Sequence, residues 1–229
     1  MSRSLIAPFA LACSALVGTS AHADVVAFSG FANGSQSVDI ALSSPNAALG
    51  ITAIAGGLLT SLNGGAAFTT YCIDLYEHIE FGQPAYTDYS LVSGAAHVFA
   101  NNAHANTDIG KLFAEGNVVN DATTQAAFQI AIWEIAYETS GSYNLSNGAA
   151  RFSGGTALSS GALALASAWL DALPAAVNPG YSVAVLESIG RPGHQDQVFA
   201  VPEPSTCALL AAGLLGVGLT TRRRTAQPR

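Results

Sequence analysis

The sequence predicts an α+β fold, in which a β-rich scaffold of sandwich or barrel type carries an inserted helical subdomain and a C-terminal hydrophobic helix follows. Three observations support this prediction. Segments with strand-like alternation lie at both ends of the central region, and segments with helical spacing lie between them. The central region, residues 24–200, is long enough to enclose one hydrophobic core. The last residues form a separate apolar run.

The first part of the central region predicts strands. Asp24–Phe31 and Gln36–Leu42 have the alternation and β-branched content of strands, and Asn33-Gly34 between them is a hairpin signal. The Gly- and Ala-rich segment 47–62 favours neither helix nor strand. Residues 66–75 alternate well enough for a further strand.

The middle of the central region predicts helices. Residues 90–100 carry apolar side chains at helical spacing, and 108–115 form a short helix. Asp121 is the N-cap of a longer helix that runs to about Thr139. The remaining elements are a loop over 144–161, a helix over 160–173, and strands over 181–188 and 197–201.

The charge of the central region is strongly negative. It holds three basic residues against fourteen acidic ones, a formal charge of −11 with histidine neutral. Such a charge repels nucleic acid and anionic lipid. Ser, Thr, Asn and Gly supply most of the polar surface, which favours a protein of the cell wall or extracellular matrix.

The N-terminus predicts export. Residues 1–23 combine the basic Arg3, an apolar stretch over 5–17 and the small-x-small sequence Ala21-His22-Ala23. These are the three parts of a cleavable signal peptide. The mature chain therefore begins near Asp24, in an oxidising compartment.

The C-terminus, 201–229, resembles the PEP-CTERM sorting signal of exported Gram-negative proteins. Pro202, Glu203 and Pro204 precede an apolar helix over 205–221 and a basic stop, Arg222-Arg223-Arg224. The helix is close to the length that spans a bilayer, and the arginines should stay cytoplasmic. The resemblance implies exosortase-type sorting machinery as a partner and tethering to the membrane before processing.

Cys72 is the lone cysteine of the central region, because Cys13 lies in the signal peptide and Cys207 in the tail. An exported domain with one cysteine has no internal disulfide. The thiol therefore needs burial, a partner in another molecule, or another kind of bond.

Two segments resemble the thioester domains of bacterial surface proteins, over about residues 70–138. Cys72 lies in Tyr71-Cys72-Ile73-Asp74, which matches the family's aromatic-Cys-apolar-Asp/Asn strand. Gln129 lies in the second segment, where Ala131, Ile132 and Trp133 complete the family's Gln-x-Ala-Ile-Trp pattern. The resemblance implies a Cys72–Gln129 thioester, supported by Asp74, Phe128, Ile132 and Trp133.

The second segment departs from the family at one position, since Phe128 replaces the threonine before the glutamine. Thr124-Gln125 offers a rival start but lacks the Ile-Trp that follows. Gln125 and Gln129 are four residues apart and share one helix face. Burial of an inert thiol, with Gln129 and Trp133 covering a helix face, is the structural alternative.

No enzyme signature accompanies these segments. No Gly-x-Ser-x-Gly, phosphate-loop or paired-carboxylate pattern is present, and we expect no enzyme and no cofactor. His78, His97 and His104 match no tight metal-ligand spacing, so we expect no metal. The sequence predicts an exported adhesin that attaches covalently to an amine or hydroxyl of a partner surface. The alternative is a non-covalent structural or carbohydrate-binding matrix component.

Overall fold

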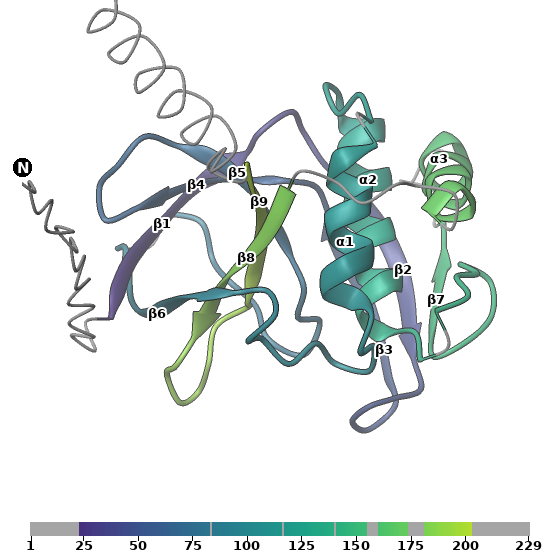
Figure 1. Ribbon diagram of the computed structural model, residues 1–229, viewed down its shortest axis with the longest axis horizontal. Coiled ribbons are helices and arrows are strands. Elements are labelled where there is room, and N and C mark those ends of the chain that lie inside the picture. The colour runs from purple at the N-terminus through teal and green to yellow at the C-terminus, as the bar shows by residue number, and fades with distance from the viewer. Residues whose placement is uncertain are drawn as a thin grey trace, which may run out of the picture.

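The computed structural model describes residues 23–82, 84–115, 117–139, 141–154, 160–173 and 181–202. These residues form the α+β architecture that the sequence predicts, with a barrel on one side and helices and a smaller sheet on the other (Figure 1). Residues 1–22 of the signal peptide, the hydrophobic helix 205–221 and the basic stop 222–224 lie outside the described residues. So do Glu203 and Pro204, whereas Pro202 ends the last strand.

The barrel closes through six antiparallel strands. In spatial order they are β1 (Asp24–Phe31), β4 (Leu58–Leu62), β5 (Phe68–Cys72), β9 (Gln197–Pro202), β8 (Tyr181–Ser188) and β6 (Tyr86–Ser93). Pairing of β1 with β6 completes the circle. In β5 and β9, Cys72 lies opposite Gln197. The barrel-like scaffold is therefore confirmed, and closure removes free sheet edges.

A second sheet of three antiparallel strands lies beside the barrel. Its order is β3 (Leu49–Ala55), β2 (Gln36–Leu42) and β7 (Ala150–Ser153). The middle strand β2 buries alternate side chains, Val38, Ile40 and Leu42, and so presents one face to the core.

Three helices fall between the barrel strands β6 and β8 in the chain. They are α1 (Ala105–Ala114), α2 (Ala122–Tyr137) and α3 (Ser160–Ala172). Asp121 caps α2 as the sequence predicts, because its side chain accepts from the Thr124 N–H at 2.8 Å. The Thr124 hydroxyl in turn accepts from the Asp121 N–H at 3.1 Å. This reciprocal cap satisfies two backbone donors at the helix start.

Helix α2 forms the centre of the core. Every residue from 125 to 138 is buried, so the helix has no solvent face. It contacts α1, α3, β3, β5 and β7, and thereby joins the barrel to the second sheet. No helix among the described residues has both the length and the apolar content needed to cross a bilayer.

The helix predicted over 90–100 is wrong. Tyr86–Ser93 instead forms β6, which pairs with both β1 and β8. The backbone then turns at Gly94, where a Cβ would meet the Val183 carbonyl and the Asn106 side chain. Ladder hydrogen bonds on two sides outweigh a helical spacing carried by few residues.

The hairpin predicted at Asn33-Gly34 is also wrong, although both flanking strands are present. β1 pairs with β4 and β6, whereas β2 pairs with β3 and β7. The chain passes from one sheet to the other at Gly34, which has a φ of +91° and packs against Ala122 at the start of α2. The ambiguous segment 47–62 becomes β3 and β4, and the predicted loop 144–161 contains β7.

Two buried glutamates tie α2 to the segment that leads into β7. Glu134 Oε1 accepts from the Asn144 N–H at 2.6 Å, and Glu138 Oε2 accepts from the Ala149 N–H at 3.0 Å. Glu134 is fully buried, and its Oε2 has no partner among the described residues. Burial raises the pKa of Glu134 to about 7, the Asn144 contact opposes this, and the Glu138 charge adds to it.

We expect this carboxyl to make stability fall as pH rises. The unfolded state ionises near pH 4.5 and the folded state near pH 7, so the free energy of unfolding should decrease between these values. The full loss is at most about 3 kcal/mol. Glu134→Gln should reduce the slope in chemical denaturation measured from pH 4.5 to 8. Part of the slope should remain in this variant, because burial also raises the pKa of Asp196 to about 7. An unchanged slope in Glu134→Gln would contradict the expectation.

Candidate functional site

Cys72 is the last residue of β5, in the strand where the sequence places it, although β5 ends three residues earlier than predicted. Its side chain meets a chain of buried polar groups that runs through the barrel. The Thr60 and Thr70 hydroxyls lie 2.7 Å apart, and Thr70 donates to Gln197 Oε1 at 3.2 Å. Gln197 Nε2 then donates to Cys72 Sγ at 3.4 Å. The thiol therefore lies at the end of a satisfied polar network.

Gln129 reaches Cys72 from the N-terminal half of α2. Its Oε1 accepts from the Cys72 backbone N–H at 2.9 Å, and its Nε2 donates to the Cys72 carbonyl at 2.7 Å. Both ends of one carboxamide are thus held by one residue that is 57 positions away in the chain. The pairing places the amide carbon of Gln129 against the residue that carries the thiol.

Gln125, the rival glutamine, has other partners. Its Oε1 accepts from the Gly57 N–H at 2.9 Å and from the Tyr71 hydroxyl at 3.1 Å. A Cβ at position 57 would collide with this oxygen, so glycine is needed for the approach. Of the two glutamines, Gln129 is the one that is hydrogen-bonded to the Cys72 backbone, and Gln125 joins α2 to the β4–β5 side of the barrel.

The sulfur itself contacts the segment that precedes β9. Cys72 Sγ donates to Gln195 Oε1 at 2.8 Å, and Gln195 Nε2 donates to the Asp74 carbonyl at 2.6 Å. The Gln195 carbonyl accepts from the Tyr89 hydroxyl at 2.9 Å. Burial raises the pKa of the Cys72 thiol to about 12, more than the Gln197 contact lowers it. The thiol is therefore neutral and held in one orientation.

Asp74 organises the chain that leaves β5. Its Oδ1 accepts from the Tyr76 N–H at 2.7 Å and from the Tyr137 hydroxyl at 3.4 Å. The same hydroxyl accepts from the Leu75 N–H at 2.8 Å. The Asp74 carboxylate thus supports the turn beside the site, and its carbonyl anchors the Gln195 side chain that contacts the sulfur.

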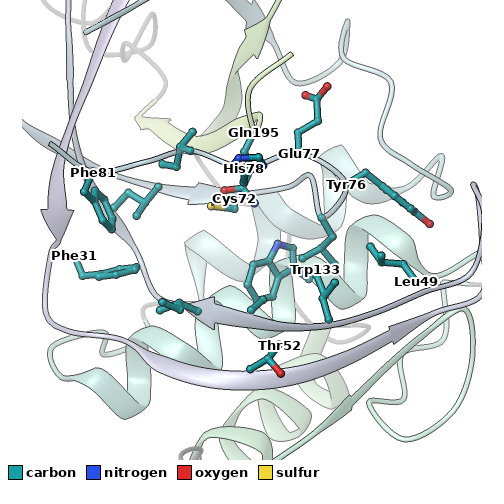
Figure 2. Close-up of a pocket in the computed structure, with 16 residues that line it drawn as sticks. Phe31, Leu49, Thr52, Cys72, Tyr76, Glu77, His78, Phe81, Trp133 and Gln195 are labelled. Atoms are coloured by element: carbon teal, nitrogen blue, oxygen red, sulfur yellow. Dashed lines mark hydrogen bonds between the residues drawn. The ribbon is translucent and has the colours of Figure 1, made fainter. Parts of the chain in front are cut away.

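A groove of about 470 Å³ opens over Cys72 (Figure 2). Its walls come mainly from β3 and the segment after β5. Figure 2 shows Phe31 and Phe81 at one end, Tyr76 and Leu49 at the other, and Trp133 between them. Cys72, Gln195, Glu77 and His78 also line it. An apolar groove with a few polar groups at one point is the common form of a ligand site.

The three predicted supporting residues of α2 have different surroundings. Trp133 lines the groove with Cys72. Phe128 packs against Tyr71, with ring centroids 4.8 Å apart, and Ile132 is fully buried in the core. Of these three side chains, Trp133 is therefore the one that reaches the groove, and the other two belong to the core that encloses α2.

The three histidines that were considered as metal ligands lie in different parts of the structure. His78 lines the groove, His97 Nδ1 lies 3.8 Å from Glu187, and His104 precedes α1. Within the described ranges, no group of three or more His, Cys, Asp and Glu side chains could hold a metal ion.

The sequence analysis missed Gln195, Gln197 and Tyr137. Gln197 begins β9 and Gln195 lies two positions before it, a spacing that places both side chains on one face where the chain is extended. That alternation was visible in the sequence. Their approach to Cys72 was not, because it depends on the pairing of β5 with β9.

Comparison with known proteins identifies one family motif. Residues 200–224 match the PEP-CTERM protein-sorting motif. This confirms the resemblance of the tail and marks the chain as an exported protein sorted to the cell surface, with exosortase processing implied. No curated protein matches the chain.

Two solved structures are similar to the described fold. The N-terminal domain of the Streptococcus pyogenes pilus tip adhesin Cpa has 16% identity and a TM-score of 0.48, covering 81% of this chain and 96% of that chain. The N-terminal thioester domain of fibronectin-binding protein SfbI from Streptococcus pyogenes has 18% identity and a TM-score of 0.46, with coverage of 77% and 92%.

The environment of Cys72 leads to a prediction about its reactivity. As a free thiol with a pKa near 12, it should be alkylated by iodoacetamide at pH 7.5 at least about a hundredfold more slowly in the folded protein than after unfolding, since the thiolate is the nucleophile. Peptide mass spectrometry at Cys72 would measure both rates. Equal rates in the two states would show that burial does not protect the sulfur.

Proposed function

We propose that this exported protein is a covalent adhesin that uses an internal thioester between Cys72 and Gln129. The observation that supports the proposal most is the double hydrogen bond between the Gln129 carboxamide and the backbone of Cys72, at 2.9 and 2.7 Å. A contact of this kind holds the Gln129 amide beside the residue that carries the nucleophile. Preorganisation lowers the barrier of a step that would otherwise require two free groups to meet.

The two contacts also have chemical consequences. The Cys72 N–H donates to the amide oxygen on which negative charge develops during attack, as an oxyanion-hole donor does. The Cys72 carbonyl accepts from the amide nitrogen, which is the leaving group. The sulfur attacks the Gln129 amide carbon, the C–N bond breaks, and the thiol proton leaves with the nitrogen as ammonia. One thioester forms and no oxidant is consumed.

The surroundings suit a stored acyl group. Gln129 is fully buried and Cys72 nearly so, which keeps water from the bond. The groove reaches Cys72 from outside, so a nucleophile on a partner can approach. Its attack on the Gln129 carbonyl carbon would release the thiol and leave the partner covalently attached. The reaction occurs once per molecule and is not enzymatic turnover.

A non-covalent function is the second candidate, because the polar groups of the unreacted site already have hydrogen-bond partners. Gln129 has partners for both ends of its amide, and the Cys72 thiol has two. The same contacts could serve stability alone, while the groove binds a matrix polymer without a covalent step. The negative charge of the domain disfavours nucleic acid as a partner in either case.

Intact mass separates the two functions. A thioester makes the exported protein lighter than its sequence mass by one ammonia molecule, and methylamine should add at Gln129 and release the Cys72 thiol. Cys72→Ala and Gln129→Ala should each show their full sequence mass. Gln125→Ala, at an equally buried glutamine one turn earlier on α2, should keep the deficit. Slow alkylation cannot replace this measurement, because burial alone produces it.

Full sequence mass in the wild-type protein, together with no methylamine adduct at Gln129, would rule out the covalent function. The non-covalent matrix function would then be the better account of the groove.

The tail leads to a separate prediction about sorting. We propose that the helix 205–221 spans the membrane with 222–224 in the cytoplasm, and that processing removes it near Pro202–Pro204. Peptide mapping of cell-surface material should then find no peptide beyond this point. Replacing all three arginines by alanine should leave unprocessed chains. Recovery of the protein in the cytoplasm would contradict the sorting proposal and leave the thioester untested by this route.

A further inference from the structure

The floor of the groove carries a hydrogen-bond donor that has no acceptor among the described residues. Trp133 is 1% exposed, and its Nε1 has no partner among the described residues. In Figure 2 this nitrogen lies on the edge of the indole that points toward Cys72 and Gln195. Trp133 follows Gln129 by four residues on α2, so both side chains leave the same helix face. A buried unpaired donor in such a place calls for an acceptor from a ligand.

A hydrogen-bond acceptor appears at the same place once the thioester forms. Gln195 Oε1 accepts from Cys72 Sγ in the thiol state, at 2.8 Å. Thioester formation removes the thiol proton and leaves this oxygen without that donor. The Gln195 side chain stays in position, because its Nε2 is bound to the Asp74 carbonyl and its backbone carbonyl to Tyr89. The acylated site therefore presents one acceptor and one donor beside the sulfur.

We propose, on the basis of the thioester function, that the groove binds a carbohydrate whose hydroxyl accepts the acyl group. This hydroxyl is held between Gln195 Oε1 and Trp133 Nε1. A hydroxyl donates one hydrogen bond and accepts two, so it matches both groups and keeps a lone pair for attack. An amine attacks as the free base, and its single lone pair forms the new bond, so it cannot also accept from the indole N–H during attack. The pairing thus favours an alcohol over an amine.

The walls of the groove suit a sugar ring. Phe31 and Phe81 form an edge-to-face pair with centroids 5.1 Å apart, and Tyr76 lies toward the other end. These aromatic surfaces match the apolar C–H face of a pyranose, while the Glu77 carboxylate lines the groove as a polar group for its hydroxyls. A volume of about 470 Å³ is within the range of small-molecule sites.

The acyl transfer needs no reactant besides the thioester and the hydroxyl. The hydroxyl oxygen bonds to the Gln129 carbonyl carbon, the C–S bond breaks, and the hydroxyl proton passes to the departing sulfur. The buried thiolate accepts it readily, because burial raises the pKa of this thiol to about 12. The products are an ester at Gln129 and the Cys72 thiol, which again donates to Gln195 Oε1.

A competition experiment tests the proposal on the exported full-length protein. The protein is incubated with methyl glucoside and methylamine together, and mass spectrometry of the Gln129 peptide gives the ratio of sugar ester to methylamide. Trp133→Phe removes the indole donor and should lower this ratio roughly tenfold. Gln195→Met removes an acceptor that both nucleophiles use, so it should slow both products and leave the ratio unchanged.

Two controls define the result. Thr52→Val, which alters the groove wall away from the sulfur, should leave the ratio at the wild-type value. A third competitor, N-acetylserine amide, presents a hydroxyl without a sugar ring and should form less ester than methyl glucoside does.

Three outcomes would overturn the hydroxyl site. These are a wild-type protein that forms methylamide but no sugar ester, a wild-type ratio in Trp133→Phe, and a serine ester that exceeds the sugar ester. The first and third need no variant, so a misfolded Trp133→Phe protein does not prevent a decision. A wild-type protein without the ammonia deficit before any nucleophile is added would instead refute the thioester itself.

Discussion

The hydrogen bonds between the Gln129 carboxamide and the backbone of Cys72 are the contact on which the rest of the site depends. They join the middle of α2 to the end of β5 by two hydrogen bonds, at 2.9 and 2.7 Å. Both residues are buried, so water cannot replace these bonds. Loss of the Gln129 carboxamide would leave the Cys72 N–H and carbonyl unpaired in the core, which costs more than the bonds contribute when made. The contact therefore sets the depth and rotation of α2 against the barrel.

Once α2 is placed, the other parts of the site follow from helix and strand geometry. Gln125 lies one turn before Gln129 and reaches Gly57, so the two glutamines hold α2 to two different strand ends. Trp133 lies one turn after Gln129 and reaches the groove. In the barrel wall, pairing of β5 with its neighbour β9 brings Gln197 and Gln195 to the sulfur. One buried helix and one strand pair thus collect groups from three parts of the chain.

Burial has opposite effects on the two reacting groups. It raises the pKa of Cys72 and so suppresses the thiolate, which makes the site slow to react with outside reagents. It also removes water and strengthens the hydrogen bonds that polarise the Gln129 amide. A site of this kind is suited to one intramolecular step, in which proximity replaces thiolate concentration, rather than to repeated turnover. The same logic applies to the groove, whose opening lies beside the sulfur while the amide stays enclosed.

The sequence by itself determined the features that depend on neighbouring residues. These include the sorting motif at the C-terminus, the Asp121 cap of α2, the strand around Cys72, and the two short segments that resemble a thioester site. It did not determine that 86–93 is a strand, that Asn33-Gly34 crosses between sheets, or that Gln195 contacts the sulfur. Only the tertiary structure decided these, because barrel closure pairs β6 with β1 and β8, and the β5–β9 pairing brings Gln195 and Gln197 to Cys72 from over 120 positions away. No local pattern contains the free energy of such long-range hydrogen bonds, and it is that free energy which overrides local spacing.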